Sequence, residues 1–212
     1  MNIALIGASG FIGSALLYEA LQRGHQVKAL VGRPEKLATA RGLNGVKTDV
    51  MDTGTLTRQL SGQDIVISAF SGHAQDAVQA YYERGIRSII AATKAAGVPR
   101  LLVVGGAGSL EVATGVQLLD TPEFPPEYRA TAEGARTALA LLRDEAELDW
   151  SMLSPAAVIA PGERTGRFRL GGDQLLIDDQ GQSRISVEDY AVAMLDELES
   201  PVHHRRRFSV AY

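Results

Sequence analysis

The glycine-rich segment Gly7-Ala8-Ser9-Gly10-Phe11-Ile12-Gly13 constrains this chain more than any other part of its sequence. It stands between a short apolar run at residues 3–6, which predicts a buried strand, and a helical pattern at residues 12–23. Gly7 would let the chain turn sharply off the strand, Gly10 would leave room beside the backbone, and Gly13 would let the helix pack closely on the strand. The unpaired N–H groups at the start of the helix would then bind an anion such as a diphosphate.

The spacing of these glycines is G-x-x-G-x-x-G, which differs from the stricter dinucleotide-binding spacing G-x-G-x-x-G. The chain contains 22 glycines, so three of them at this spacing are weak support by themselves. Their position between a strand and a helix is what favours a dinucleotide site over a purely structural turn.

The composition argues against several other classes of protein. A net charge of −4 disfavours a nucleic-acid-binding protein, because such proteins bind phosphates with basic surfaces. The absence of cysteine excludes disulfides and thiolate catalysis, and the four histidines, among them His73 beside the predicted site, show no metal-ligand pattern. No stretch approaches the roughly 20 apolar residues that span a bilayer, so we expect no membrane partner and a cytoplasmic protein.

Strand patterns and helical patterns alternate along almost the whole chain. We expect strands at residues 3–6, 27–31, 46–49, 64–70, 101–104, 150–153 and 207–210, with a strand pair at 168–170 and 174–177. Helices are expected at residues 12–23, 34–41, 53–60, 74–96, 127–147 and 187–198, the last with Ser186 as its N-cap. The alternation predicts one Rossmann-type α/β domain, with a doubly wound parallel sheet of about six to seven strands. Residues 1–108 would form its cofactor half and residues 109–212 a substrate wall.

Short segments that follow the predicted strands would meet at one edge of the sheet, because ligands of open α/β sheets bind at the carboxyl ends of strands. These segments are Asp49-Val50, Ala69-Phe70-Ser71, Gly105-Gly106 and Pro155-Ala156. The first would meet an adenine ring, although a capping or turn role is equally open for Asp49. The glycines would leave room for a flat ring, and Pro155-Ala156 would lie beside the nicotinamide.

The end of the second predicted strand indicates which nicotinamide cofactor is bound. Proteins that bind the non-phosphorylated cofactor usually carry an Asp or Glu there, which binds the ribose hydroxyls. This chain has Arg33 instead, followed by Lys36. A guanidinium suits a 2′-phosphate through paired hydrogen bonds, so we expect NADP(H), with NAD(H) as the alternative. The competing interpretation is that Arg33 is a solvated turn residue and that Lys36 is a surface lysine.

With these segments, the chain resembles the atypical short-chain dehydrogenase/reductases. It is most similar to the group that comprises NADH-flavin reductases and NmrA-like or biliverdin-reductase-B-like NAD(P)H-binding proteins. The resemblance covers nearly the whole chain and rests on the glycine segment and on residues 31–37, 103–109, 153–166 and 185–191. Many relatives carry arginine one position before Arg33, where this chain has Gly32.

Ordinary members of that superfamily use Tyr-x-x-x-Lys, in which the lysine lowers the pKa of the tyrosine so that the phenol can act as acid or base. The candidate tyrosine here is Tyr128, but Ala132 stands where the lysine would be. No other tyrosine of the chain is followed by lysine at this spacing. A carbonyl reductase that works through tyrosine is therefore disfavoured.

The resemblance implies hydride transfer from NADP(H) to a flavin or a similar flat acceptor, with the flavin as substrate rather than as tightly bound cofactor. Such a reaction needs no acid–base pair, because the isoalloxazine ring is itself the electron acceptor. Ser109 would then bind the edge of the ring, unless it is a turn or helix-cap residue. The alternative is a non-catalytic NADP(H)-binding sensor of the NmrA-like type. The sequence leaves the oligomeric state open.

Overall fold

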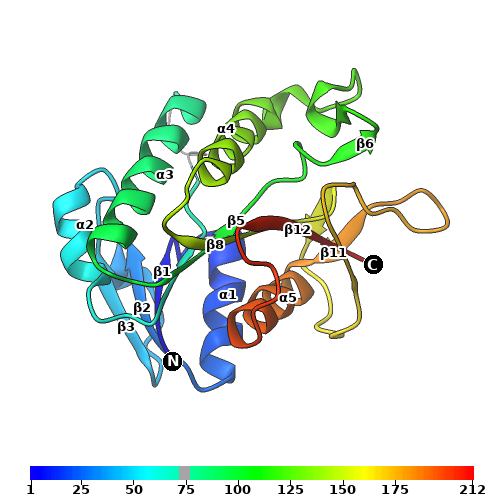
Figure 1. The fold of residues 1–212 in the computed structure, drawn as a ribbon. Helices are drawn as coiled ribbons and strands as arrows, with labels where there is room; N and C mark the ends of the chain where they lie inside the picture. The colour runs from blue at the N-terminus through cyan, green and yellow to red at the C-terminus, as the bar shows by residue number, and fades with distance from the viewer. Residues whose placement is uncertain (72–76) are drawn as a thin grey trace.

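The computed structural model describes residues 1–71 and 77–212, and its main feature is a mostly parallel β-sheet (Figure 1). In this described part of the chain the sheet has eight strands in the order β10-β12-β8-β5-β4-β1-β2-β3. Only β10 runs antiparallel to its neighbour. In chain order the strands are β1 (Asn2–Ile6), β2 (Gln26–Val31), β3 (Leu43–Lys47), β4 (Ile65–Ser68), β5 (Arg100–Val104), β8 (Asp149–Ser154), β10 (Arg169–Gly171) and β12 (Arg206–Ala211).

Helices cover both faces of this sheet, which is the doubly wound arrangement that the sequence predicts (Figure 1). One face carries α1 (Phe11–Gln22) and α5 (Val187–Glu199). The other carries α2 (Thr53–Leu60), α3 (Val78–Ala95) and α4 (Pro126–Arg143). Smaller elements are η1 (Pro34–Lys36), β6 (Glu111–Ala113), β7 (Val116–Gln117), η2 (Leu118–Asp120), β9 (Val158–Ala160) and β11 (Arg184–Ser186).

Local sequence signals account for where the helices begin and end. The side chain of Asp52 accepts a hydrogen bond from Thr55 N at 2.9 Å and caps α2. Ser186 caps α5 in the same way, as predicted, by accepting from Asp189 N at 3.0 Å. Pro126 opens α4, where its missing N–H costs no helical hydrogen bond. Gly24, at φ 79°, follows the end of α1.

Four of the predicted elements need correction. The helix expected at residues 34–41 is only the short 3-10 helix η1, which ends at Lys36. The third strand lies at Leu43–Lys47, three residues before its predicted start, because Leu43 is the residue that pairs with Val27. Helix α4 ends at Arg143, where the Glu145 side chain accepts backbone hydrogen bonds from Glu147 and Leu148 and turns the chain. The predicted pairing of residues 168–170 with 174–177 is wrong, because β10 pairs with β12 and residues 174–177 form no strand.

The carbonyl of Leu153 joins the two halves of the molecule at the end of β8. It accepts a hydrogen bond from Gly105 N at 2.8 Å and a second from the Tyr190 hydroxyl at 2.7 Å. Tyr190 is fully buried, and burial raises its pKa well above the usual value, so the phenol stays protonated as a donor. The shared carbonyl fixes β5 and α5 relative to β8 at the edge where ligands of such sheets bind.

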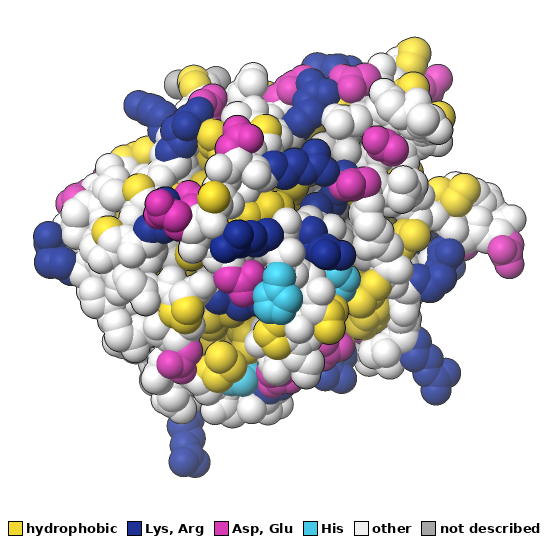
Figure 2. All heavy atoms as spheres, viewed as in Figure 1, with side chains coloured by type: hydrophobic (Ala, Val, Ile, Leu, Met, Phe, Trp, Pro, Cys, Tyr) yellow, Lys and Arg dark blue, Asp and Glu magenta, His cyan; other side chains and the backbone are white. Residues whose placement is uncertain are grey.

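The surface in the same view is mixed in charge. Figure 2 shows basic side chains lying next to acidic ones over this face. Several of them form ion pairs, such as Arg100 with Asp149 at 2.8 Å and Lys94 with Glu147 at 2.7 Å. Among the helices of the described residues, none combines the length and apolar character needed to cross a membrane.

We predict that Tyr190→Phe lowers the free energy of unfolding by about 1–2 kcal/mol, because it removes one buried hydrogen bond while Leu153 O keeps its bond to Gly105. Urea denaturation would measure the change. Tyr18→Phe is the matched control, because Tyr18 is 63% exposed and its loss should change stability by less than about 0.5 kcal/mol. Equal stability of the two variants would contradict the role of the shared carbonyl.

Candidate functional site

The glycine turn has the tight geometry that its sequence predicts. Gly7 has φ 80°, and a Cβ atom there would lie 2.5 Å from Ala69 O. A Cβ atom on Gly13 would lie 2.0 Å from Gly7 O, which no side chain can tolerate. Both glycines are therefore required by packing: Gly7 lets the end of β4 approach, and Gly13 lets α1 approach the turn.

Gly10 differs from the other two glycines, because a Cβ atom there would contact only Gly7 O, at 3.3 Å. Gly10 is the N-cap of α1, and Ser14 N donates to its carbonyl at 2.8 Å. Among the described residues, the N–H groups of Phe11 and Ile12 have no backbone acceptor. The open side of Gly10 and these free donors fit a diphosphate at the start of the helix.

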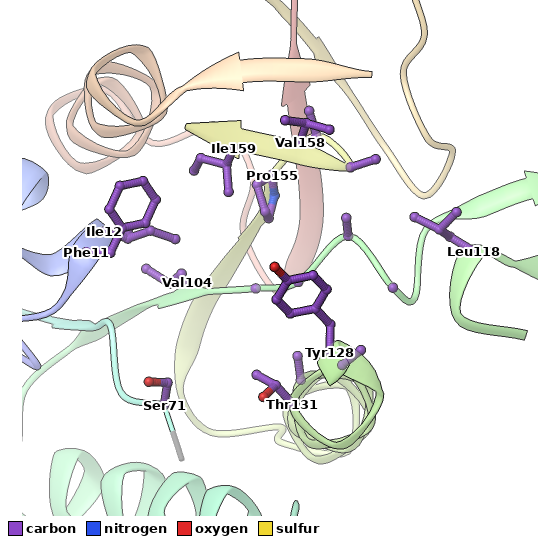
Figure 3. A pocket seen from close by; sticks show the side chains of 18 of the residues that line it. Phe11, Ile12, Ser71, Val104, Leu118, Tyr128, Thr131, Pro155, Val158 and Ile159 are labelled. Atoms are coloured by element: carbon purple, nitrogen blue, oxygen red, sulfur yellow. The ribbon is translucent and has the colours of Figure 1, made fainter. Parts of the chain in front are cut away.

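A cavity of about 730 Å³ begins at this turn and runs along the carboxyl ends of β4, β5 and β8 (Figure 3). Such a volume is typical of small-molecule sites. It is lined by these predicted site residues: Gly10, Phe11, Ile12, Gly13, Ala69, Phe70, Ser71, Gly105, Gly106, Tyr128, Pro155 and Ala156. The structure thus brings together segments that are far apart in the sequence.

Other lining residues were missed by sequence reasoning: Tyr82, Val104, Leu118, Thr121, Glu123, Phe124, Pro125, Thr131, Ala135, Val158 and Ile159. One signal could have found some of them. Residues 128, 131, 132 and 135 follow helical spacing, so they line one face of α4. Figure 3 shows Tyr128 and Thr131 on this helix, opposite Val104 and Pro155.

An aromatic cluster supports the cavity on the α3 side. The ring of Phe70 lies 5.5 Å from that of Tyr81 and 5.9 Å from that of Tyr82, centroid to centroid. Gly85 of α3 makes room for it, since a Cβ atom there would lie 2.2 Å from the Phe70 ring. Burial raises the pKa of Tyr82 to about 12, so this phenol is protonated near neutral pH and cannot act as a base.

The glycines that follow β5 line the cavity and are also required by packing. A Cβ atom on Gly105 would meet Met152 Cγ at 2.8 Å, and one on Gly106 would meet Ala135 Cβ at 3.1 Å. A Cβ atom on Gly108 would lie 2.8 Å from Ala132 Cβ. These glycines therefore let β8 and α4 pack against the loop, and the space for a flat ring comes from the arrangement of the whole wall.

Tyr128 lies on the first turn of α4 with its hydroxyl directed into the cavity (Figure 3). Tyr128 is 59% exposed, so solvent reaches it. Ala132, one turn further along α4, lines the same cavity where a Tyr-x-x-x-Lys pair would place its lysine. Tyr128 can thus donate or accept a hydrogen bond, but no lysine of this motif activates it.

Ser109 does not line the cavity, in contrast to the expectation that it binds the acceptor. It is buried, and its hydroxyl accepts a hydrogen bond from Arg207 Nη1 at 3.0 Å. Arg207 is buried in β12 and donates from Nε to Asp173 Oδ1 at 2.7 Å. Asp173 O in turn accepts from Glu111 N at 2.9 Å, so this network ties the loop after β5 to the C-terminal strand.

The remaining predicted residues lie outside the cavity lining. Arg33 follows β2 and is exposed, with no hydrogen bond or ion pair of its side chain to the described residues. Lys36 and Ser9 are exposed as well. The Asp49 carboxylate accepts from Met51 N at 2.9 Å, which is the turn role, and Val50 is buried against the core beside α2 and α3.

His73 lies outside the described residues. Among the residues that are described, no cluster of His, Asp or Glu side chains is arranged to hold a metal ion.

A glycine turn between a parallel strand and a helix, at the edge where β1 separates β2 from β4, defines a dinucleotide-binding Rossmann protein. The profile of a family described as NAD(P)H-binding matches residues 7–198. The chain belongs to this NAD(P)H-binding family.

Individual relatives extend over the whole chain. The uncharacterized protein YwnB of Bacillus subtilis is 42% identical and spans 99% of this chain and 98% of its own length. A structure from Bacteroides thetaiotaomicron, provisionally described as an epimerase, is 46% identical with a TM-score of 0.93 and spans 100% of this chain and 96% of its own. A structure from Streptococcus pneumoniae, provisionally described as an NADH-flavin reductase, is 35% identical with a TM-score of 0.87. It spans 100% of this chain and 99% of its own.

We predict that Ser109→Ala lowers the free energy of unfolding by about 1–2 kcal/mol, because it removes an acceptor from the buried guanidinium of Arg207. Thermal or urea denaturation would measure the loss. Ser9→Ala is the control, because Ser9 is exposed in the glycine turn and its hydroxyl makes no hydrogen bond to another described residue. Unchanged stability of the Ser109 variant would argue against the network described above.

Proposed function

We propose that this protein is an NADP(H)-dependent reductase that transfers hydride from the nicotinamide to a flavin or a similar flat acceptor. The observation that carries the proposal is the cavity itself, a mostly apolar space that begins at the dinucleotide turn and has no Tyr/Lys pair. When bound, NADP(H) would supply two electrons and a proton as hydride, and the acceptor would take its second proton from water. The similarity to a protein provisionally described as an NADH-flavin reductase supports this choice of acceptor.

Each part of the site has a task in such a reaction. The free amides of Phe11 and Ile12 would hold the diphosphate, which places the nicotinamide against Pro155 and Ala156. The wall made by α4 and Leu118 would hold the acceptor ring against the nicotinamide and exclude water from between them. Tyr128 would orient the ring through a hydrogen bond from its hydroxyl.

The proposed preference for the phosphorylated cofactor depends on Arg33. Gly7 N donates to Leu30 O at 3.0 Å, so the end of β2 lies directly beside the glycine turn. Arg33 follows that strand end, and its exposed guanidinium is not committed to another described residue. A guanidinium in this place can bind the 2′-phosphate with two charge-assisted hydrogen bonds.

The alternative is a non-catalytic NADP(H) sensor, and the replacement of lysine by Ala132 fits it as well as it fits the reductase. The size of the cavity beyond the nicotinamide position favours the reductase, because a sensor needs no acceptor site. An epimerase needs a base at the reacting carbon. Tyr128 has no lysine partner of the usual motif, and Tyr82 is protonated, so the phenols of the cavity do not provide one.

We predict that the purified protein oxidises NADPH when riboflavin is added, because the cavity accommodates a flat ring beside the nicotinamide. The decrease in absorbance of NADPH would measure turnover, and quenching of the fluorescence of Trp150 or of NADPH would measure binding. Tight binding of NADPH without turnover on any flat acceptor would favour the sensor and refute the reductase.

We predict that Arg33→Ala raises the Kd for NADPH by about tenfold to a hundredfold, the loss of one or two hydrogen bonds to a charged group. The Kd for NADH should change by less than about twofold, because NADH lacks the 2′-phosphate. Arg84→Ala serves as the control, since Arg84 is also exposed but lies on α3. An unchanged ratio of the two affinities in the Arg33 variant would refute the phosphate assignment.

A further inference from the structure

The charge of the cavity wall limits which flat acceptors fit it. Among the described lining residues there is no lysine or arginine, and the one charged side chain is Glu123. By sequence, residues 72–76 contain no lysine or arginine either. An anionic group that enters this cavity therefore finds no lysine or arginine among the described residues of its wall.

Glu123 belongs to a segment that we name the acidic strap, residues 118–128, which runs from the end of the hairpin β6–β7 through the first turn of α4. The strap contains Asp120, Glu123 and Glu127 and no lysine or arginine. Leu119 fixes it to the loop after β5, since Leu119 N donates to Gly108 O at 2.7 Å and its side chain is fully buried. The acidic strap thus has a defined position at the cavity.

The arginines next to the acidic strap already interact with other groups of the protein. Arg136 pairs with Asp120 at 2.9 Å and with Glu133 at 2.7 Å. Arg129 donates to Leu119 O at 3.1 Å and its guanidinium lies 5.7 Å from the centre of the Phe124 ring. Glu123 and Glu127 are exposed and have no ion-pair partner among the described residues. The strap therefore presents uncompensated negative charge to an entering ligand.

We infer that the acceptor is an uncharged flat ring without a phosphate, so that riboflavin is a better substrate than FMN or FAD. The inference rests on the proposed function and refines its substrate class. The phosphate of FMN carries a charge of about −1.5 to −2 at neutral pH. Bringing it near Glu123 costs Coulomb energy and provides no ion pair in return. The apolar and aromatic remainder of the wall, with Phe70 and Phe124, suits the ring itself.

Riboflavin and FMN form a matched pair for the test, because they share the ring and the ribityl chain and differ only in the phosphate. We expect kcat/KM with NADPH to be about tenfold higher for riboflavin than for FMN at low ionic strength. Added salt should reduce this ratio, because it screens the repulsion. Glu123→Gln should reduce the ratio by about threefold. Asp144→Asn should leave it unchanged, since Asp144 is an exposed carboxylate at the opposite end of α4.

The possible outcomes separate the two proposals. Equal or faster turnover of FMN would overturn the inference about charge while leaving the reductase intact. A riboflavin preference that neither salt nor Glu123→Gln reduces would show that the acidic strap is not its source, and would equally overturn the inference. The absence of turnover with every flavin, despite NADPH binding, would refute the proposed function itself.

Discussion

The contact between α1 and the turn after β1 is the constraint on which the rest of the site depends. Gly13 approaches the carbonyl of Gly7 so closely that no side chain fits between them. This approach orients the start of α1, where the amides of Phe11 and Ile12 have no backbone acceptor. Because Gly7 also admits Ala69 after β4, one turn positions both the start of α1 and the cavity wall beside it.

The C-terminal half reaches the same edge through a small number of polar contacts. The Leu153 carbonyl holds Gly105 and Tyr190, and Arg207 holds Ser109 and Asp173. None of these four side chains or amides needs to contact a ligand. Their effect is to fix the backbone of the loop after β5, against which α4 packs closely at Gly106 and Gly108. The wall formed by this loop and α4 is therefore held by contacts between segments that are far apart in the sequence.

Few side chains of the cavity wall can act as an acid or a base, and this limits its chemistry. Burial keeps Tyr82 protonated, and Ala132 provides no lysine for Tyr128. A site of this kind stabilises reactants by stacking and by exclusion of water rather than by proton transfer. In our proposal, the exposed carboxylates of the acidic strap would add selectivity, because they would distinguish acceptors by charge rather than by ring shape.

The sequence alone was sufficient for the alternating order of strands and helices. The alternation of apolar runs and helical patterns predicted the doubly wound sheet, and the predicted helix cap at Ser186 is confirmed. Both predictions depend on local signals. It was less informative where strands pair over long distances, so β10 was assigned the wrong partner and β3 began earlier than expected. These errors share a cause: the register of a strand depends on its neighbours in space, which the local pattern does not record.

The sequence by itself predicted a tight turn at Gly7, Gly10 and Gly13 between a strand and a helix, and it shows that the Tyr/Lys pair is absent, since both are properties of spacing along the chain. Only the tertiary structure decided what Ser109 and the glycines after β5 do. The Ser109 hydroxyl is directed to Arg207, nearly a hundred residues later, and Gly105 is required by Met152 of a neighbouring strand. Such roles are created by packing between distant segments, and the same packing brings Glu123 to the wall of the cavity.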